Sequence, residues 1–242
     1  MSVRERPILF KDIMVRAIRD GRKTVTRRLV DPAPIGDMRW NETQRGAAGA
    51  RITSWIDDVR MYRCPFGEVG DRLWVREAWL PDPSADDVAW DDWTDTYYSW
   101  SGCGSRIDGV PPALRSPEHC IYREGWNGGG LRWRPSIHMP RWASRILLEV
   151  TEVRVERLQD GEGETAFESR YLAEGLFKIH HGDGDYYYSA FHSEPTPKDW
   201  CWPEDAFREL WEFMNGGILS FGSWSANPWV WVVEFKVLEG RA

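Results

Sequence analysis

The sequence predicts an α+β protein in which helices flank a small mixed β-sheet or barrel, with large loop insertions. Two stretches carry the spacing of helices that bury one face, and the chain closes on an alternating apolar pattern typical of a half-buried strand. The predicted strands do not alternate regularly with helices, as a doubly wound fold would require. The order of elements therefore favours a mixed or antiparallel sheet, or a barrel made from one.

The first predicted helix covers residues 10–18. Its apolar residues recur at the i, i+3, i+4, i+7 and i+8 positions of one helical face, namely Phe10, Ile13, Met14, Ala17 and Ile18. Gly21 follows where the helix should end, because glycine takes the left-handed conformation without a Cβ penalty. Residues 24–26 are β-branched and predict that a strand begins there.

Two more strands are predicted in the centre of the chain. A turn at 67–71 precedes the first, at residues 72–79. Residues 146–158 are also strand-like, but the apolar pattern changes phase near Thr151 and Glu152. This change predicts either a bulge or a break into two strands.

The last third of the chain predicts two helices and a final strand. Thr165 and Glu168 have capping-box spacing in a helix over 164–173, and Gly175 follows its end. The next helix has four apolar residues on one side, namely Phe207, Leu210, Trp211 and Met214. Residues 229–238 alternate between apolar and partly polar side chains, which predicts a half-buried strand.

We interpret residues 1–242 as a single domain with turn-rich or polar insertions at about 31–60, 81–130 and 176–200. The chain contains no phosphate-binding Walker loop, no dinucleotide-binding fingerprint and no His-Glu-x-x-His zinc motif. The sequence thus gives no reason to expect a nucleotide cofactor.

The composition is that of an ordinary soluble protein, and the cysteine pattern favours a reducing compartment inside the cell. No apolar run approaches the 18 residues of a membrane span, and the Arg-rich N-terminus lacks the apolar region of a secretory signal. We therefore expect a cytoplasmic protein with no membrane partner. The four cysteines lie at irregular spacings without a Cys-x-x-Cys pair, so free thiols are expected rather than a metal site.

The charge is unevenly distributed. The net charge is −7, yet residues 1–30 carry nine basic and three acidic residues, while residues 82–95 carry six aspartates and no base. Such segregation permits a positive site for a nucleic acid or nucleotide on an acidic protein. It is equally compatible with solvated helix faces. The chain also has 16 tryptophans, most of which we assign to the core or to packing within the insertions.

The basic, hydroxyl-rich run at residues 21–28 is the strongest clue to function. It reads Gly-Arg-Lys-Thr-Val-Thr-Arg-Arg and falls where the first helix gives way to a strand. Cations and hydroxyls at such a bend can hold an anionic or carbonyl-bearing ligand. The candidate binding residues of this run are Arg22, Thr24, Arg27 and Arg28.

This run, and the blocks that follow it, resemble the ASCH domain family of the PUA-like β-barrels. The resemblance continues with Gly-Asp-Arg-Leu-Trp-Val at 70–75, with the helix ending Ala-Glu-Gly at 173–175, and with the last strand at 229–236. The blocks occur in the family's order and span nearly the whole chain. Cys-Pro-Phe-Gly at 64–67 and the segment 133–140 also look like a long phage- or prophage-associated branch.

The resemblance implies a small barrel with a cleft for RNA, DNA or a modified nucleobase. It also implies a possible chemistry, because one bacterial branch consists of amidohydrolases that remove an acyl group from the exocyclic amine of acetylated cytidine. That branch uses a lysine, a threonine and a glutamate, which correspond by motif position to Lys23, Thr26 and Glu174. A non-catalytic RNA- or DNA-binding module is the alternative, and a nuclease is a third.

Amide hydrolysis needs a nucleophile, a base and stabilisation of the oxyanion. Thr26 can serve as the nucleophile, Lys23 as the base if its amine is neutral, and Glu174 as an orienting or relay group. Within a regular strand, Lys23 and Thr26 would point to opposite sides. They converge if Lys23 belongs to the turn instead, and otherwise Thr26 is a β-former and Lys23 a solvated cation.

A second candidate surface alternates guanidinium groups and indoles. Arginine binds phosphate bidentately and tryptophan stacks on bases, so the segment suits single-stranded nucleic acid. The alternative is a loop held by Trp packing, with its arginines paired to the Asp-rich insertion. The candidate residues are Arg132, Trp133, Arg134, Arg141 and Trp142.

Overall fold

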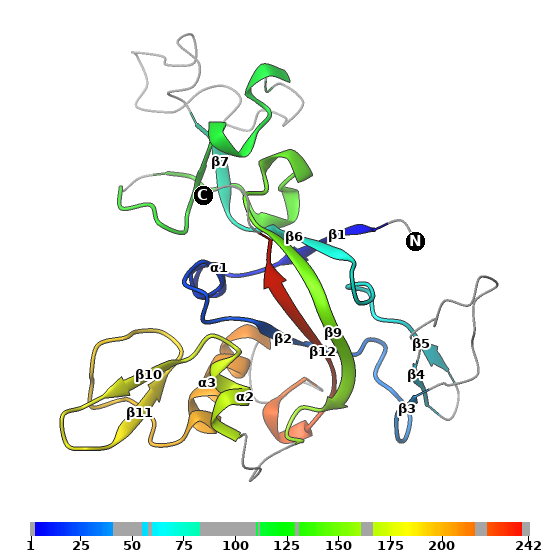
Figure 1. The fold of residues 1–242 in the computed structure, drawn as a ribbon, viewed down its shortest axis with the longest axis vertical. Coiled ribbons are helices and arrows are strands. Elements are labelled where there is room, and N and C mark those ends of the chain that lie inside the picture. Colours follow the sequence, from blue (N-terminus) through cyan, green and yellow to red (C-terminus); the bar gives the residue numbers. More distant parts are fainter. Residues whose placement is uncertain are drawn as a thin grey trace. The chain divides into compact units, whose positions relative to one another are not determined.

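The computed structural model describes residues 3–40, 55–57, 60–82, 110, 112–128, 131–160, 167–215 and 222–238 (Figure 1). The chain divides into two compact units. Unit 1 comprises Met1–Arg4, Ala17–Asp71 and Glu149–Lys236, and unit 2 comprises Glu5–Arg16, Arg72–Leu148 and Val237–Ala242. The sequence predicts a single domain, and this division into two compact units does not test that prediction.

Unit 1 is built on three strands in the order β9-β12-β2. These are β9 (Leu147–Arg157), which begins in unit 2, β12 (Trp229–Val237) and β2 (Val25–Leu29). β12 and β2 are antiparallel. Because Val230, Val232 and Val233 are fully buried, β12 supplies the centre of this unit's core.

Two helices and two small sheets complete unit 1. The helices are α2 (Phe167–Leu172) and α3 (Pro203–Asn215), which meet where the rings of Tyr171 and Phe207 lie 5.1 Å apart. A β-hairpin of β10 (Phe177–His180) and β11 (Tyr186–Ser189) occupies much of the predicted 176–200 insertion (yellow in Figure 1). The other sheet joins three two-residue strands, β3 (Arg39–Trp40), β4 (Trp55–Ile56) and β5 (Met61–Tyr62).

Unit 2 combines two pairs of strands with short helices. β1 (Glu5–Leu9) pairs in parallel with β6 (Arg72–Arg76), and β7 (Trp79–Pro81) pairs antiparallel with β8 (Cys120–Tyr122). The helix α1 (Asp12–Arg19) starts here and ends in unit 1. The described residues of unit 2 form 3-10 helices at Pro112–Leu114, Pro117–His119, Ser136–His138 and Arg141–Ala143, and those of unit 1 form one at Trp224–Ala226.

The structure confirms the α+β class, since strands of both orientations dominate and few helices accompany them. The described strands do not close into the expected barrel. None of the helices in the described parts of the chain is long and apolar enough to span a membrane.

The predicted elements at both ends are present, whereas the central strands differ. β6 stops at Arg76 and β7 starts at Trp79, because the chain turns Glu77 inward, where its carboxylate pairs with Arg145. β9 is continuous, yet Thr151 and Glu152 are both exposed between buried residues on either side. The alternation of buried and exposed residues therefore changes phase where predicted, but the strand is not broken there. The proposed capping residue Thr165 lies outside the described residues.

Candidate functional site

The end of α1 determines where Lys23 lies. Gly21 adopts a φ of 72°, and its amide donates to the carbonyl of Ile18 at 3.0 Å. The amides of Arg22 and Lys23 both donate to the carbonyl of Ala17 at 2.9 Å. This is the hydrogen-bond pattern of a Schellman helix end. Lys23 consequently belongs to the turn and not to a regular strand, which is the condition under which it could converge with Thr26.

The end of α2 brings Glu174 to the same place. Glu174 and Lys23 form an isolated antiparallel bridge, and the amides of Thr24 and Val25 donate to the carbonyl of Ala173 at 2.9 and 3.1 Å. Two helix ends, 151 residues apart in the sequence, are thus joined by backbone hydrogen bonds. The predicted pair Lys23 and Glu174 lies together in unit 1.

Lys23 is a buried ammonium group with a full set of acceptors. Its Nζ lies 2.5 Å from Glu174 Oε2, 3.1 Å from the Glu174 carbonyl and 2.7 Å from the Val25 carbonyl. Only 2% of Lys23 and 4% of Glu174 is exposed. An ammonium has three N–H donors, so these contacts use all of them.

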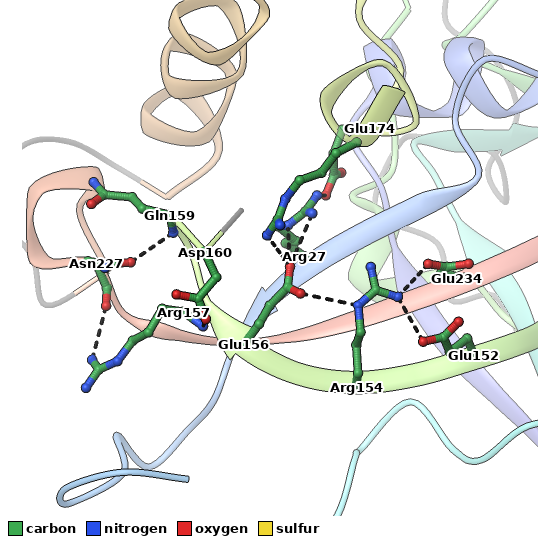
Figure 2. A network of polar contacts seen from close by, with 11 residues as sticks. Arg27, Glu152, Arg154, Glu156, Arg157, Gln159, Asp160, Glu174, Asn227 and Glu234 are labelled. Atoms are coloured by element: carbon green, nitrogen blue, oxygen red, sulfur yellow. Dashed lines mark hydrogen bonds and ion pairs between the residues drawn. The ribbon is translucent and has the colours of Figure 1, made fainter. Parts of the chain in front are cut away.

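Arg27 extends the pair into a larger cluster, and Figure 2 shows Arg27 with Glu174, Glu156 and Arg154. Its Nη1 donates to the second Glu174 oxygen at 2.9 Å, and its Nε and Nη2 lie 3.3 and 3.2 Å from Glu156. Glu156 also accepts from Arg170 at 2.5 Å and from Arg154 at 3.2 Å. We call Lys23, Arg27, Glu156 and Glu174 the ionic cluster. Charges of opposite sign alternate along it, as a buried ionic arrangement requires.

The pKa shifts in the cluster follow from its burial and its charges. Burial lowers the pKa of the Lys23 amine, Glu174 opposes this change, and the cations Arg28 and Arg27 reinforce it. Burial alone would raise the pKa of Glu174, but Lys23 and Arg27 outweigh it and hold that pKa below its usual value. The charge of Arg28 therefore acts on the site although Arg28 belongs to the following strand.

The lowered pKa of Glu174 predicts a loss of stability in acid. A carboxylate whose pKa is lower in the folded state stabilises the fold above its unfolded pKa of about 4.3, and this contribution disappears as the pH falls through the folded value. We expect the difference in unfolding free energy between wild type and Glu174→Gln, measured by urea denaturation, to shrink below about pH 4. A difference that stays constant from neutral pH to pH 3 would contradict this expectation.

Gly175 makes the close approach of the two helix ends possible. Its φ is 102°, and a Cβ at this position would lie 2.7 Å from Ala17 Cβ and 3.2 Å from Lys23 Cβ. We expect Gly175→Ala to destabilise unit 1 by about 2–4 kcal/mol, since backbone strain and overpacking add. Gly182→Ala is the matched control, because Gly182 has a φ of 86° with nothing within 4 Å of the added Cβ. Thermal denaturation of both variants tests this, and equal losses would refute the packing argument.

Thr26 is buried on β2, where it pairs with Val233 of β12. Among the described residues, its hydroxyl makes no hydrogen bond to Lys23 or Glu174. Side chains alternate along a strand, so Thr26 shares a face of β2 with Arg28 and not with its neighbour Arg27. The structure thus joins two of the three catalytic candidates, Lys23 and Glu174, directly, and it places Thr26 on the face of β2 opposite to Arg27, the other partner of Glu174.

The other binding candidates of the motif differ in exposure. Arg22 is partly buried, with its guanidinium 3.7 Å from the centre of the Phe177 ring, and it donates to the Gly175 carbonyl. Thr24 is exposed and Arg28 is partly exposed. The Nε atom of Arg28 is buried, and Arg22 also pairs with Asp20 at 2.9 Å, so Thr24 is the most accessible of the three, whereas Lys23 and Arg27 are buried.

The candidates at 132–142 lie in unit 2, and packing holds both tryptophans. The indole of Trp133 lies 6.1 Å from that of Trp126, and Trp142 packs edge-on against Trp79 at 5.3 Å. Arg132 and Arg141 are exposed. Arg141 pairs with Glu5 at 2.7 Å, and Arg134 exchanges backbone hydrogen bonds with Trp79. The Asp-rich insertion lies largely outside the described residues.

Three charged residues at the site were not predicted from the sequence, namely Glu156 of the ionic cluster and its partners Arg154 and Arg170. A signal was present, since charges of alternating sign occupy every second position of β9 at Glu152, Arg154 and Glu156. Side chains at this spacing share one face of a strand, which predicts a row of ion pairs. The position of Arg170 depends on tertiary packing and has no such local signal.

No group of side chains suited to a metal ion occurs in the described ranges. Cys64 and Cys120 are free and buried, and Cys201 is free and exposed. Burial raises the pKa of the Cys120 thiol to about 12, so this thiol is not a ready metal ligand or nucleophile.

Fold and site together define an α+β protein in which a buried ionic cluster joins two helix ends to the central strands of unit 1. Comparisons with protein-family models, with curated proteins and with solved structures found no match to this chain.

Proposed function

We propose that the chain is an ASCH-type, PUA-like protein that recognises a nucleic acid or a modified nucleoside at the Gly21–Arg28 motif of unit 1. The observation that carries the proposal is the direct contact of Lys23 with Glu174, at 2.5 Å. The resemblance implies a shared site for these two residues, and they meet from opposite parts of the chain. Residues that matched the family's motifs only by chance would have no reason to do so.

Within this proposal, the ionic cluster is the support and the exposed motif residues are the ligand contacts. The buried charges hold the turn and β2 in place through contacts from two helices and two strands. Arg22, Thr24 and Arg28 then present two guanidinium groups and a hydroxyl to the ligand. Arginine and hydroxyl donors suit phosphate oxygens and base carbonyls.

Catalysis is the second candidate function, and the environment of Lys23 favours it. Burial lowers the pKa of this amine and so favours its neutral form, although the neighbouring carboxylate of Glu174 opposes the change. A neutral Lys23 could accept the proton of Thr26 while Thr26 Oγ attacks the acyl carbon. The exocyclic amine would leave with a proton, and water would hydrolyse the resulting threonine ester to release the carboxylic acid.

Binding and turnover of cytidine acetylated on its exocyclic amine test both candidates. We expect calorimetry to show that wild type binds this nucleoside and that Arg28→Met weakens binding at least about tenfold, a loss of about 1.4 kcal/mol. Lys198→Met, which alters an exposed lysine, is the control. Absence of binding to the acetylated nucleoside, to cytidine and to short RNA and DNA would overturn the proposal.

Chromatography of the reaction mixture separates the two candidates. Catalysis predicts release of cytidine by wild type, loss of turnover in Thr26→Val, which keeps the shape but removes the hydroxyl, and partial activity in Thr26→Ser. Binding without turnover in all three proteins would leave recognition alone. If a polynucleotide is the ligand, its affinity should fall as salt rises, in proportion to the phosphates contacted.

A further inference from the structure

Unit 1 contains a pocket of about 470 Å³ that the proposed function does not use. It lies where the segment after β2 meets the end of β9, and it is lined by Pro34, Gly36, Asp37, Arg39 and Arg157. A smaller pocket of about 160 Å³ shares Pro34 and Arg157 with it and adds the ring of Trp229. The larger volume is within the range that holds small organic ligands.

The guanidinium of Arg157 is held in this pocket by neutral groups. Its Nη1 donates to the carbonyl of Asn227 at 3.1 Å, a contact drawn in Figure 2, and its Cζ lies 4.4 Å from the centre of the Trp229 ring. The indole of Trp229 is anchored in turn, because its Nε1 donates to the Gly36 carbonyl at 3.2 Å. A side chain that is fixed in this way loses little entropy when a ligand binds.

Asp37 is the acidic neighbour of Arg157, but the two side chains do not form a hydrogen bond. The ion pair is long, since Arg157 Nη2 and Asp37 Oδ1 are 4.0 Å apart. The two side chains are 37% and 90% exposed, respectively. Within the described part of the chain, the guanidinium donates only to Asn227, and the Asp37 carboxylate accepts no hydrogen bond. The pair therefore presents a donor and an acceptor side by side, without a net charge.

A donor beside an acceptor fits a ligand edge on which a carbonyl lies next to an N–H group. The Watson–Crick edge of guanine is of this kind, because O6 accepts a hydrogen bond while N1–H and the exocyclic amine donate. A guanidinium can donate to O6, and a carboxylate can accept from both neighbouring N–H groups. Uracil offers the carboxylate only one N–H group, and adenine carries its donor and acceptor in the reverse order. A free anion would be repelled by Asp37.

We propose that this pocket binds a guanine base, with O6 at Arg157, with N1–H and the exocyclic amine at Asp37, and with the ring against Pro34. It is a second site in unit 1. It rests on the proposed function in one respect, namely the choice of a nucleobase among molecules that carry such an edge. Free guanosine and a guanine within a single strand present the same groups to the pocket.

Calorimetry with the full chain and guanosine tests the proposal. We expect wild type to bind guanosine and Asp37→Ala to bind it at least about tenfold more weakly. The Asp37 side chain is almost fully exposed, so its truncation should leave the fold intact. Asp185→Ala is the matched control, because it removes another exposed carboxylate of unit 1, and it should bind guanosine like wild type.

The choice of base provides a readout that a merely structural role of Asp37 would not change. Wild type should bind adenosine at least about tenfold more weakly than guanosine. In Asp37→Asn the amide can donate where the carboxylate can only accept. This variant should therefore prefer xanthosine, which has a carbonyl in place of the exocyclic amine, to guanosine. Equal binding of adenosine and guanosine by wild type, or a retained preference of Asp37→Asn for guanosine, would overturn the proposal.

Further arms identify the source of the base and separate this site from the Gly21–Arg28 motif. Tighter binding of a short single-stranded RNA with one guanine than of guanosine, with loss when adenine replaces that guanine, would identify a strand as the ligand. Arg28→Met should keep guanosine binding even if it abolishes binding of acetylated cytidine, and Asp37→Ala should show the converse. If wild type does not bind guanosine, or if Asp37→Ala binds it as wild type does, the pocket proposal is wrong whatever the result for acetylated cytidine.

Discussion

Glu174→Ala is expected to lower the free energy of unfolding by about 3–5 kcal/mol, measured by urea denaturation at neutral pH. The reason is that both carboxylate oxygens of Glu174 are engaged, one by Lys23 and one by Arg27, and all three residues are buried. Removing the carboxylate leaves two cations in a low-dielectric environment without their shared partner. The cost of an uncompensated buried charge is larger than the net value of the pair itself.

Two further variants test whether burial of the charges causes the expected loss of stability in Glu174→Ala. Glu149→Ala breaks the ion pair with Lys236, in which the two side chains are 30% and 59% exposed, and it should cost no more than about 1 kcal/mol. The double variant Lys23→Met/Glu174→Leu removes the amine and the carboxylate together and should recover part of the loss. A loss below about 1 kcal/mol for Glu174→Ala would show that its charge is not buried as described.

Arg145→Met is expected to have an effect of similar size, about 3–5 kcal/mol, in unit 2. Arg145 lies between Glu77 and Glu124, whose side chains are only 1% and 5% exposed. Without the guanidinium, two carboxylates remain buried next to one another. They repel each other, and the contact of Glu124 with Arg16, which is 3.5 Å long and involves a side chain that is 60% exposed, offsets only part of the desolvation cost.

Arg141→Met provides the comparison within the same segment. Its guanidinium pairs with Glu5 at the surface, where the two side chains are 45% and 35% exposed, so its removal should change the unfolding free energy by less than about 1 kcal/mol. Equal losses for Arg145→Met and Arg141→Met would contradict the distinction between buried and exposed pairs.

Local periodicity accounts for the parts of the fold that the sequence predicts. The helical spacing from Phe10 to Ile18 and the alternation of the last strand each depend on one buried face, and α1 and β12 form there. By contrast, β1 shows no clear alternation, includes Pro7, and pairs in parallel with β6, which lies more than 60 residues further along the chain. Such pairing is decided by tertiary contacts and leaves no short-range pattern.

The candidate site shows the same difference between features set by local sequence patterns and features set by tertiary contacts. The turn chemistry of Gly21 predicts the bend that holds Lys23, and the structure contains that bend. The pairing of Lys23 with Glu174 was expected from the family resemblance and not from any local pattern. The role of Arg27 as the second partner of Glu174 was missed, because a cation in a basic run looks the same whether it faces a ligand or a buried carboxylate.

Burying the charges of the ionic cluster carries a desolvation cost, and apolar side chains of similar volume often stabilise a fold equally well. Its presence is explained more simply if it holds particular side chains in a required position. Under this account, stability and recognition in unit 1 depend on the same four residues.

Nuclear magnetic resonance of the arginine side chains, recorded while acetylated cytidine is added to the full chain, tests the central claim most directly. We predict that the Nε–H signals of Arg22 and Arg28 shift in a saturable manner, because these residues line the proposed ligand site in unit 1. The signal of Arg208 should not move. Unchanged signals for Arg22 and Arg28 at saturating nucleoside, or shifts confined to arginines outside the motif, would contradict recognition at Gly21–Arg28.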